Sequence, residues 1–201
     1  MGTAPRTARG RATRQRILRA ATELISERGV AGTSLDDVRE LAQASKSQLY
    51  LYFPDRDTLL REVAESTCDT VIETQAEALA EFDSIAGIKR YLDATVALQL
   101  QREQPAGCPI ASLAGQLADH DEHTRLILAD GLDRWEEGFR RGLQAMAERG
   151  ELNPNAEPAA LANQSLAILQ GGLLLTQVRR DAAQMRLAAD TVLALISEAS
   201  T

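Results

Sequence analysis

Apolar residues recur every three to four positions along most of the chain, the spacing that places them on one face of an α-helix. The pattern is clear between Arg11 and Arg28, and Gly29 follows as a C-terminal stop signal. No segment alternates apolar and polar residues as a half-buried β-strand does. The pattern therefore predicts an all-α fold of about nine helices.

Further helices are predicted downstream of this first one. Asp55 is an N-cap candidate for a long connector helix over about residues 55–80. A short helix is expected to open at Cys108 and Pro109. The other predicted helices span about residues 84–104, 121–149, 156–180 and 183–199.

The stretch 33–53 predicts two short helices joined by a tight turn. Ser34 is a good N-cap residue, and Asp37 three positions later completes a capping box. Ser45 and Gln48 repeat this arrangement at the start of the second helix. Such a pair is typical of a helix-turn-helix, whose second helix enters the DNA major groove. The side chains expected to face outward from that helix are Lys46, Ser47, Gln48, Tyr50 and Tyr52.

The distribution of charge supports a DNA partner, although the whole chain has a net charge of −7. Residues 1–60 carry ten Arg or Lys and seven Asp or Glu, a net charge of +3, so the remainder carries −10. A basic head on an acidic body is the electrostatic pattern of a DNA-binding protein. Residues 1–10 lack apolar periodicity and predict a disordered basic arm.

Composition excludes several other classes of protein. No run of about 18 apolar residues suggests a membrane span. Two cysteines are too few for a disulfide framework, which favours a reducing, cytoplasmic setting. The chain has no phosphate-binding loop, dinucleotide fingerprint or nucleophile elbow, so we expect neither an enzyme nor a bound cofactor.

The run Ser45–Leu60, SKSQLYLYFPDRDTLL, resembles the S-K-G-x-L-Y-x-Y-F-x-x-[KR]-[DE]-x-L-L motif of TetR/AcrR-type transcriptional regulators. The resemblance covers about residues 13–62 and includes Glu27-Arg28-Gly29 and Gly32-Thr33-Ser34. The chain has Gln43 at the turn and Ser47 in the second helix where the family usually has Gly. Because a left-handed turn residue is cheapest as Gly, Gln43 predicts either modest local strain or a different turn geometry.

This resemblance implies a domain organisation and a set of partners. Residues 11–54 would form the DNA-binding domain, and residues 55–201 an effector-binding and dimerisation domain entered through the connector helix. The implied partners are a palindromic operator in double-stranded DNA, a small-molecule effector and a second copy of the chain. The DNA-contacting residues implied by the matching motif are Thr33, Ser34, Ser45, Lys46, Ser47, Gln48, Tyr50 and Tyr52.

These DNA contacts divide into two kinds. Lys46, Tyr52 and the Thr33–Ser34 pair would hold phosphates, as would the arginine-rich N-terminus. Ser47, Gln48 and Tyr50 are best placed for base edges, and Gln48 could pair bidentately with adenine.

Two further sets of residues are expected in the body. Gly171 and Gly172 indicate a close backbone approach by another element, and the resemblance implies that the last two helices form the dimer interface. Packing within the chain is the alternative. The interface residues we expect are Leu166, Leu169, Gly171, Gly172, Leu175, Val192 and Leu195. The residues expected to line an effector pocket are Leu98, Cys108, Leu113, Leu117, Trp135, Phe139 and Gln170.

Two features of the body, and the class of the whole protein, leave alternatives open. The Gly107–Ile110 run, Gly-Cys-Pro-Ile, resembles a subgroup of the family in which some members sense electrophiles through that cysteine, so Cys108 is either a reactive thiol or a buried lining residue. His120 and His123 could bind a metal, but a polar turn capped by Asp121 fits better, so no metal is expected. The alternative from another class is a helical ligand-binding protein without operator binding.

Overall fold

The computed structural model describes residues 7–101 and 106–201. The chain divides into two compact units, one of residues Met1–Thr70 and Ser112–Ala129 and one of residues Val71–Ala111 and Asp130–Thr201. The described residues form nine α-helices and no β-strand beyond an isolated bridge between Leu152 and Ser200. The all-α prediction is therefore confirmed.

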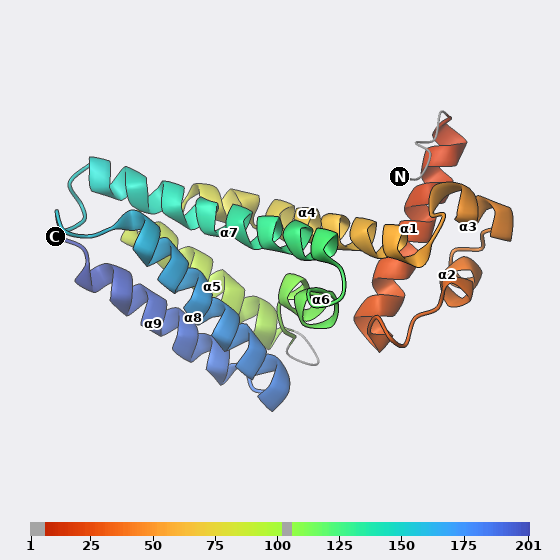
Figure 1. Ribbon diagram of the computed structural model, residues 1–201. Coiled ribbons are helices and arrows are strands. Elements are labelled where there is room, and N and C mark those ends of the chain that lie inside the picture. Colours follow the sequence, from red (N-terminus) through yellow and green to blue (C-terminus); the bar gives the residue numbers. More distant parts are fainter. Residues whose placement is uncertain (1–6, 102–105) are drawn as a thin grey trace. The chain divides into compact units, whose positions relative to one another are not determined.

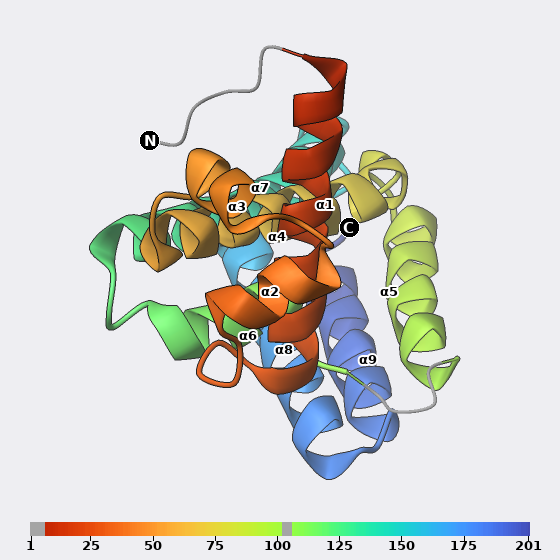
Figure 2. The same cartoon turned by 90° about the vertical axis from the view of Figure 1, so that its right-hand side faces the viewer.

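The first unit contains the three N-terminal helices, which lie next to one another in Figure 2. These are α1 (Ala8–Arg28), α2 (Leu35–Leu41) and α3 (Lys46–Tyr52). The unit also includes the start of α4 (Arg56–Ala80), the end of α6 (Pro109–Leu117) and the start of α7 (Glu122–Glu148). The compact head is thus larger than residues 11–54, because segments far along the chain pack with it.

The core of this unit follows the predicted helical stripe. Ile17 and Leu24 of α1 are buried, as are Val38 of α2 and Leu49 and Phe53 around α3. Each of these side chains is at most 4% exposed, so the two short helices are held mainly by packing against α1 and not by their own propensity.

The helix boundaries that differ most from those predicted are the start of α1 and the end of α5. α1 begins at Ala8 instead of Arg11, because the Thr7 side chain accepts a hydrogen bond from the Gly10 backbone N–H at 3.1 Å and caps it. Residues 1–6 of the expected basic arm lie outside the described residues. α5 (Ile85–Leu100) ends before the predicted Gln104, and residues 102–105 also lie outside them.

The second unit contains α5, the end of α7, and the final pair α8 (Pro158–Arg179) and α9 (Ala183–Glu198). Figure 1 shows α9 running beside both α8 and α5. Gly172 permits this packing, since a Cβ at that position would lie 2.4 Å from the Ala188 Cβ. Arg186 of α9 forms an ion pair of 2.7 Å with Asp93 of α5.

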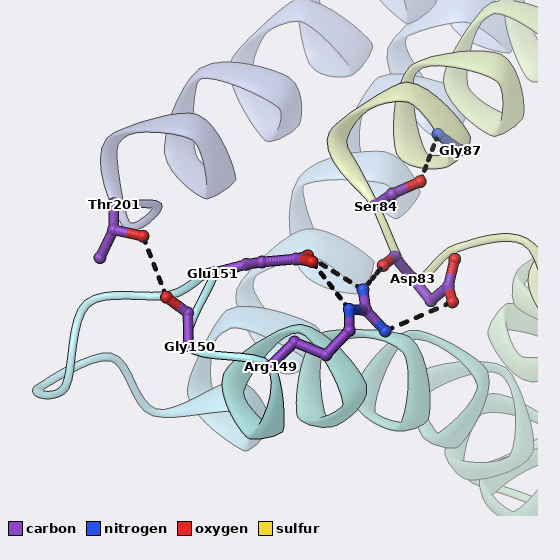
Figure 3. Close-up of polar contacts among 7 residues, drawn as sticks. All are labelled: Asp83, Ser84, Gly87, Arg149, Gly150, Glu151 and Thr201. Carbon is purple, nitrogen blue, oxygen red and sulfur yellow. Dashed lines mark hydrogen bonds and ion pairs between the residues drawn. The ribbon is translucent and has the colours of Figure 1, made fainter.

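Polar contacts join the elements at one end of the second unit (Figure 3). Arg149 at the end of α7 donates to the backbone carbonyl of Asp83 and forms an ion pair of 2.8 Å with Glu151. The Ser84 hydroxyl caps α5 by accepting from the Gly87 backbone N–H at 3.1 Å. These contacts fix the turn between α4 and α5 against α7.

By length and composition, α8 is the only helix among the described residues that could cross a membrane. Of its most apolar window, 44% is buried inside the protein. Its buried face packs on α9, so we interpret α8 as a helix of the body.

Candidate nucleic-acid interface

Reciprocal capping bonds set the start of α3. The Ser45 side chain accepts from the Gln48 backbone N–H at 3.2 Å, and the Gln48 Oε1 accepts from the Ser45 backbone N–H at 2.9 Å. Ser34 and Asp37 form the same capping box at the start of α2. Both predicted capping boxes are confirmed. The Gln48 carbonyl is thereby engaged, and bidentate pairing with adenine would need that same oxygen.

The turn between α2 and α3 uses a left-handed residue. Gln43 has φ = 48°, in the region that glycine adopts most cheaply. Its backbone N–H bonds the Glu40 carbonyl at 3.0 Å, and the next N–H, of Ala44, bonds the Arg39 carbonyl at 3.0 Å. The strain predicted for a non-glycine residue at this turn is therefore present in the structure.

The outer face of α3 consists of two short rows of side chains. Lys46 and Tyr50 form one row and Ser47 and Leu51 the other, each with the four-residue spacing that stacks side chains on a helix. All four side chains are exposed. Tyr52, by contrast, is only 8% exposed, so the prediction that it faces outward is wrong. It follows the buried Leu49 by three positions and joins the inward face.

The expected phosphate contacts at the start of α2 have different environments. Thr33 is 8% exposed, and its hydroxyl donates to the Gly29 carbonyl at 2.9 Å, so it shapes the turn between α1 and α2. Ser34 is exposed and shares its hydroxyl with Asp37. The bonds from Ser34 hold the pKa of the Asp37 carboxyl below its ordinary value, which keeps an acid charged next to this turn.

Two side chains that sequence reasoning did not assign hold the same turn. The Arg56 guanidinium donates to the Val30 carbonyl at 2.5 Å. The Gln116 Oε1 of α6 accepts from the Val30 backbone N–H at 2.8 Å. Arg56 occupies the basic position of the quoted motif, so that signal could have identified it. Gln116 lies 86 residues from Val30, and no local sequence pattern predicts their contact.

Two arginines of the basic N-terminal region have structural partners. Arg14 pairs with Glu62, and its guanidinium carbon lies 5.4 Å from the centre of the Phe53 ring. Arg16 donates to the Ala42 carbonyl at 2.6 Å, which caps the end of α2. These two side chains help to orient α2 and α3.

The turn before α7 is polar, and both carboxylate oxygens of Asp121 accept hydrogen bonds. Asp121 accepts two hydrogen bonds of 2.9 Å from Arg61 and one of 2.9 Å from the Thr124 backbone N–H. The hydrogen bonds from Arg61, followed by those from Thr124, lower the pKa of Asp121 well below its usual range. Among the described residues, no group of three His, Cys, Asp or Glu side chains could hold a metal ion.

The body contains a connected aromatic cluster. Tyr91 donates to Gln75 at 2.5 Å and accepts from the Trp135 Nε1 at 2.9 Å. The Tyr91 ring centre lies 5.4 Å from those of Phe82 and Phe139, in edge-to-face geometry. Burial raises the pKa of Tyr91, so its hydroxyl stays protonated. Tyr91 and Gln75 were not among the residues expected here.

The residues expected in an effector pocket fall into four groups. Cys108 is 5% exposed, and the Gln170 side-chain amide donates to its sulfur at 3.6 Å. Leu98 is 52% exposed and does not join the buried cluster. Leu113 and Leu117 are buried in the first unit, whereas Trp135 and Phe139 are buried in the second.

The residues expected at a dimer interface also differ in their exposure. Leu166, Leu169, Gly172 and Val192 are buried within the chain itself, and Leu195 is partly buried. Gly171 and Leu175 lie on an exposed face of α8. The apolar residues of α8 cover more than one face, and the sequence pattern alone does not show which face packs internally. Leu174 and Val178 of α8 and Leu187 of α9 are also exposed, at 58%, 71% and 65%.

The capped helices α2 and α3, with α3 presenting a polar and basic face, define a helix-turn-helix of the DNA-binding class. Residues 17–63 match the family described as bacterial regulatory proteins, tetR family. Residues 84–192 match the family described as tetracyclin repressor-like, C-terminal domain. The chain belongs to the TetR family and is a DNA-binding transcriptional regulator.

Relatives of this chain are regulators of the same type. An uncharacterized HTH-type transcriptional regulator from the lacX 3′ region of Lactococcus lactis subsp. lactis is 28% identical over 85% of this chain and 86% of its own length. The HTH-type transcriptional repressor DhaR of Mycobacterium sp. strain GP1 is 23% identical, over 84% of each chain. A TetR regulator structure from Chloroflexus aurantiacus has the same fold, with a TM-score of 0.82 and 23% identity, covering 96% of this chain and 98% of that one.

Proposed function

We propose that this regulator is a cytoplasmic, ligand-responsive repressor that binds a palindromic operator as a homodimer. The observation that carries the proposal is α3 itself, which is capped by Ser45 and Gln48 and leaves Lys46, Ser47 and Tyr50 exposed. A single seven-residue helix reads few base pairs, so a two-fold pair of heads is needed for a specific site. The relative DhaR is itself named a repressor, which supports the direction of control.

The contacts on DNA that we propose follow the exposure of each side chain. Lys46 and Ser34 are exposed and would hold phosphates, together with Ser45 at the start of α3. Ser47 and Tyr50 would face base edges. Gln48 would either open its capping box to reach a base or stabilise the start of the helix. Thr33 and Tyr52 would support these contacts from inside the head, because both are buried.

The dimer interface that we propose is the exposed apolar face of α8 with the adjoining part of α9. Leu174, Leu175 and Val178 lie within two turns of one another and are 58%, 40% and 71% exposed. Gly171 continues the face, and a Cβ at that position would meet nothing within 4 Å of the chain. A face of this kind is expected to be covered in the functional assembly.

The effector that we propose is small, uncharged and apolar or aromatic. Among the described residues, no Asp, Glu, Lys, Arg or His side chain is buried, and the buried polar side chains are Thr, Ser and Gln. A charged molecule in such an interior would lose its hydration without gaining a counter-charge. Trp135, Phe139, Cys108 and Gln170 of the second unit are the candidate contacts.

Thiol sensing through Cys108 is the second candidate for regulation. The cysteine directly precedes α6, and its side chain is one of two thiols in the chain. Its 5% exposure and the hydrogen bond from the Gln170 amide to its sulfur support the lining role, because a buried thiol is poorly accessible to an electrophile. The helical ligand-binding alternative without operator binding does not fit membership of a family of DNA-binding regulators.

Selection of duplexes from a random pool, followed by the stoichiometry of the complex, tests the proposal. We expect a two-fold symmetric sequence that binds an even number of chains. An asymmetric site occupied by one chain would contradict the dimer mechanism.

Release from the selected duplex separates the two modes of regulation. We expect N-ethylmaleimide, an electrophile, to have the same effect on wild type and on Cys108→Ser, whether it releases both from the duplex or releases neither. Uncharged aromatic compounds should release both proteins from the duplex. Release by N-ethylmaleimide that is lost only in Cys108→Ser would establish the thiol mechanism instead.

A further inference from the structure

We infer that Leu51 is a specificity-determining residue that contacts the 5-methyl group of a thymine in the operator. The inference rests on the proposed role of α3 in reading the major groove. It starts from the exposure of Leu51, whose side chain is 54% exposed although its neighbours Leu49 and Tyr52 are buried. An exposed leucine by itself is ordinary on a protein surface. The inference therefore depends on where Leu51 lies on α3.

Leu51 lies on the outer face of α3 and not at its back. It follows Ser47 by four residues, so the two side chains stack on one face of the helix. Helical side chains lean towards the preceding turn, which directs Leu51 over Ser47 and into the outer face. Lys46 and Tyr50 form the adjacent row, and all four side chains are exposed.

The length of α3 allows both of its ends to lie in one groove. At a rise of about 1.5 Å per residue, its seven residues span roughly 10 Å, while the major groove of B-DNA is about 12 Å wide. If the helix enters the major groove far enough for Ser47 and Tyr50 to contact base edges, Leu51 therefore also reaches the base edges in that groove.

The hydrogen-bonding capacity of this face is small. The Gln48 Oε1 accepts from the Ser45 backbone N–H at 2.9 Å, so the capping box and a bidentate pairing with adenine compete for this side chain. The remaining side chains opposite base edges are a short hydroxyl, a tyrosine ring that is 45% exposed and the leucine. The apolar feature of a base pair in the major groove is the thymine methyl group. Apolar contact, and not a bidentate hydrogen bond, is the readout that these groups provide.

Replacing thymine by uracil in the selected operator tests this inference, since it removes the methyl group and leaves base pairing intact. At one position of each half-site, the substitution should weaken wild-type binding by about three- to fivefold, the equivalent of one buried methyl group. In Leu51→Ala the same substitution should have no effect at that position, and Leu51→Met should restore most of the difference.

Leu41→Ala is the matched control, because Leu41 is an exposed leucine of α2, at 45% exposure. It should keep the wild-type preference for thymine over uracil at every position. A Leu51→Ala protein that still discriminates thymine from uracil as wild type does would overturn the assignment of Leu51 while leaving operator binding intact. A wild-type protein that selects no duplex would overturn the proposed function as well.

Discussion

The Gln116 side chain accepts a hydrogen bond from the Val30 backbone N–H at 2.8 Å, which links α6 to the turn between α1 and α2. Gly29 precedes Val30 with φ = 74°, and a Cβ on it would lie 3.0 Å from the same Gln116 oxygen. From the other side, Arg56 bonds the Val30 carbonyl. The turn that carries Ser34 is therefore held by side chains of both α4 and α6.

Gln116→Met should loosen this turn and weaken DNA binding on every sequence. It removes the acceptor of a part-buried N–H, which costs about 1–3 kcal/mol locally. Hydrogen exchange should show faster exchange at the Val30 amide, and anisotropy titrations should show operator affinity lowered by roughly tenfold. Gln144→Met on the exposed side of α7 is the control and should change neither quantity. Unchanged exchange at Val30 in Gln116→Met would show that the bond is not stabilising.

Gln43→Gly should stabilise the protein, because the native residue occupies the left-handed region with φ = 48°. A non-glycine residue pays about 1 kcal/mol or more there, and the greater freedom of glycine in the unfolded chain offsets part of the gain. We expect a net increase of about 0.5 kcal/mol in the free energy of unfolding, measured in urea. Gln144→Gly, within the regular helix α7, should change stability by about 1 kcal/mol in the opposite direction.

The ion pair between Arg61 and Asp121 should make stability depend on pH. The pKa of Asp121 is lower in the folded protein than in the unfolded chain, where it is about 3.9. The stabilisation from the charged Asp121 is thus fully present above the pKa of the unfolded chain, and it is lost as the pH falls through the pKa of the folded protein. Asp121→Asn should be less stable than wild type at pH 7, and the difference in urea midpoints should shrink below about pH 4. A difference that stays constant from pH 7 to pH 3 would show that the pair does not account for it.

Leu175→Glu should dissociate the dimer that we propose. Burying one leucine contributes about 2 kcal/mol, and a two-fold interface contains it twice, so the dimer should weaken by roughly a thousandfold. Sedimentation equilibrium measures the association directly. Leu98→Glu is the matched control, because Leu98 is 52% exposed on α5 and lies off the proposed interface. A Leu175→Glu protein that remains dimeric would move the interface to another face.

Local sequence signals predicted the elements of the head well. The Ser34 and Ser45 capping boxes each depend on residues three positions apart, and Gly29 ends α1 as expected. Signals of this range are readable because the bonds form within one turn of helix. Gln43 was recognised as a strained position for the same local reason.

Relations between distant segments were not readable. The hydrogen bond between Val30 and Gln116 joins positions 86 residues apart, and neither residue type predicts it. Tyr52 was expected outside and is buried, because the packing of α3 on the head decides its orientation. In α8, Leu166 and Leu175 were assigned to one interface, whereas one packs internally and the other is exposed. Periodicity identifies apolar faces but not their partners.

The role of α3 in DNA binding is tested most directly by the two lysines of the chain, Lys46 and Lys89. Lys46 is exposed on α3, and Lys89 is exposed on α5, where it pairs with Asp93. Affinity for the selected operator would be measured over a range of salt concentrations for Lys46→Ala and Lys89→Ala. We predict weaker binding and a salt slope reduced by about one for Lys46→Ala, with Lys89→Ala unchanged. Equal affinities and equal slopes for both variants and wild type would contradict the placement of α3 on DNA.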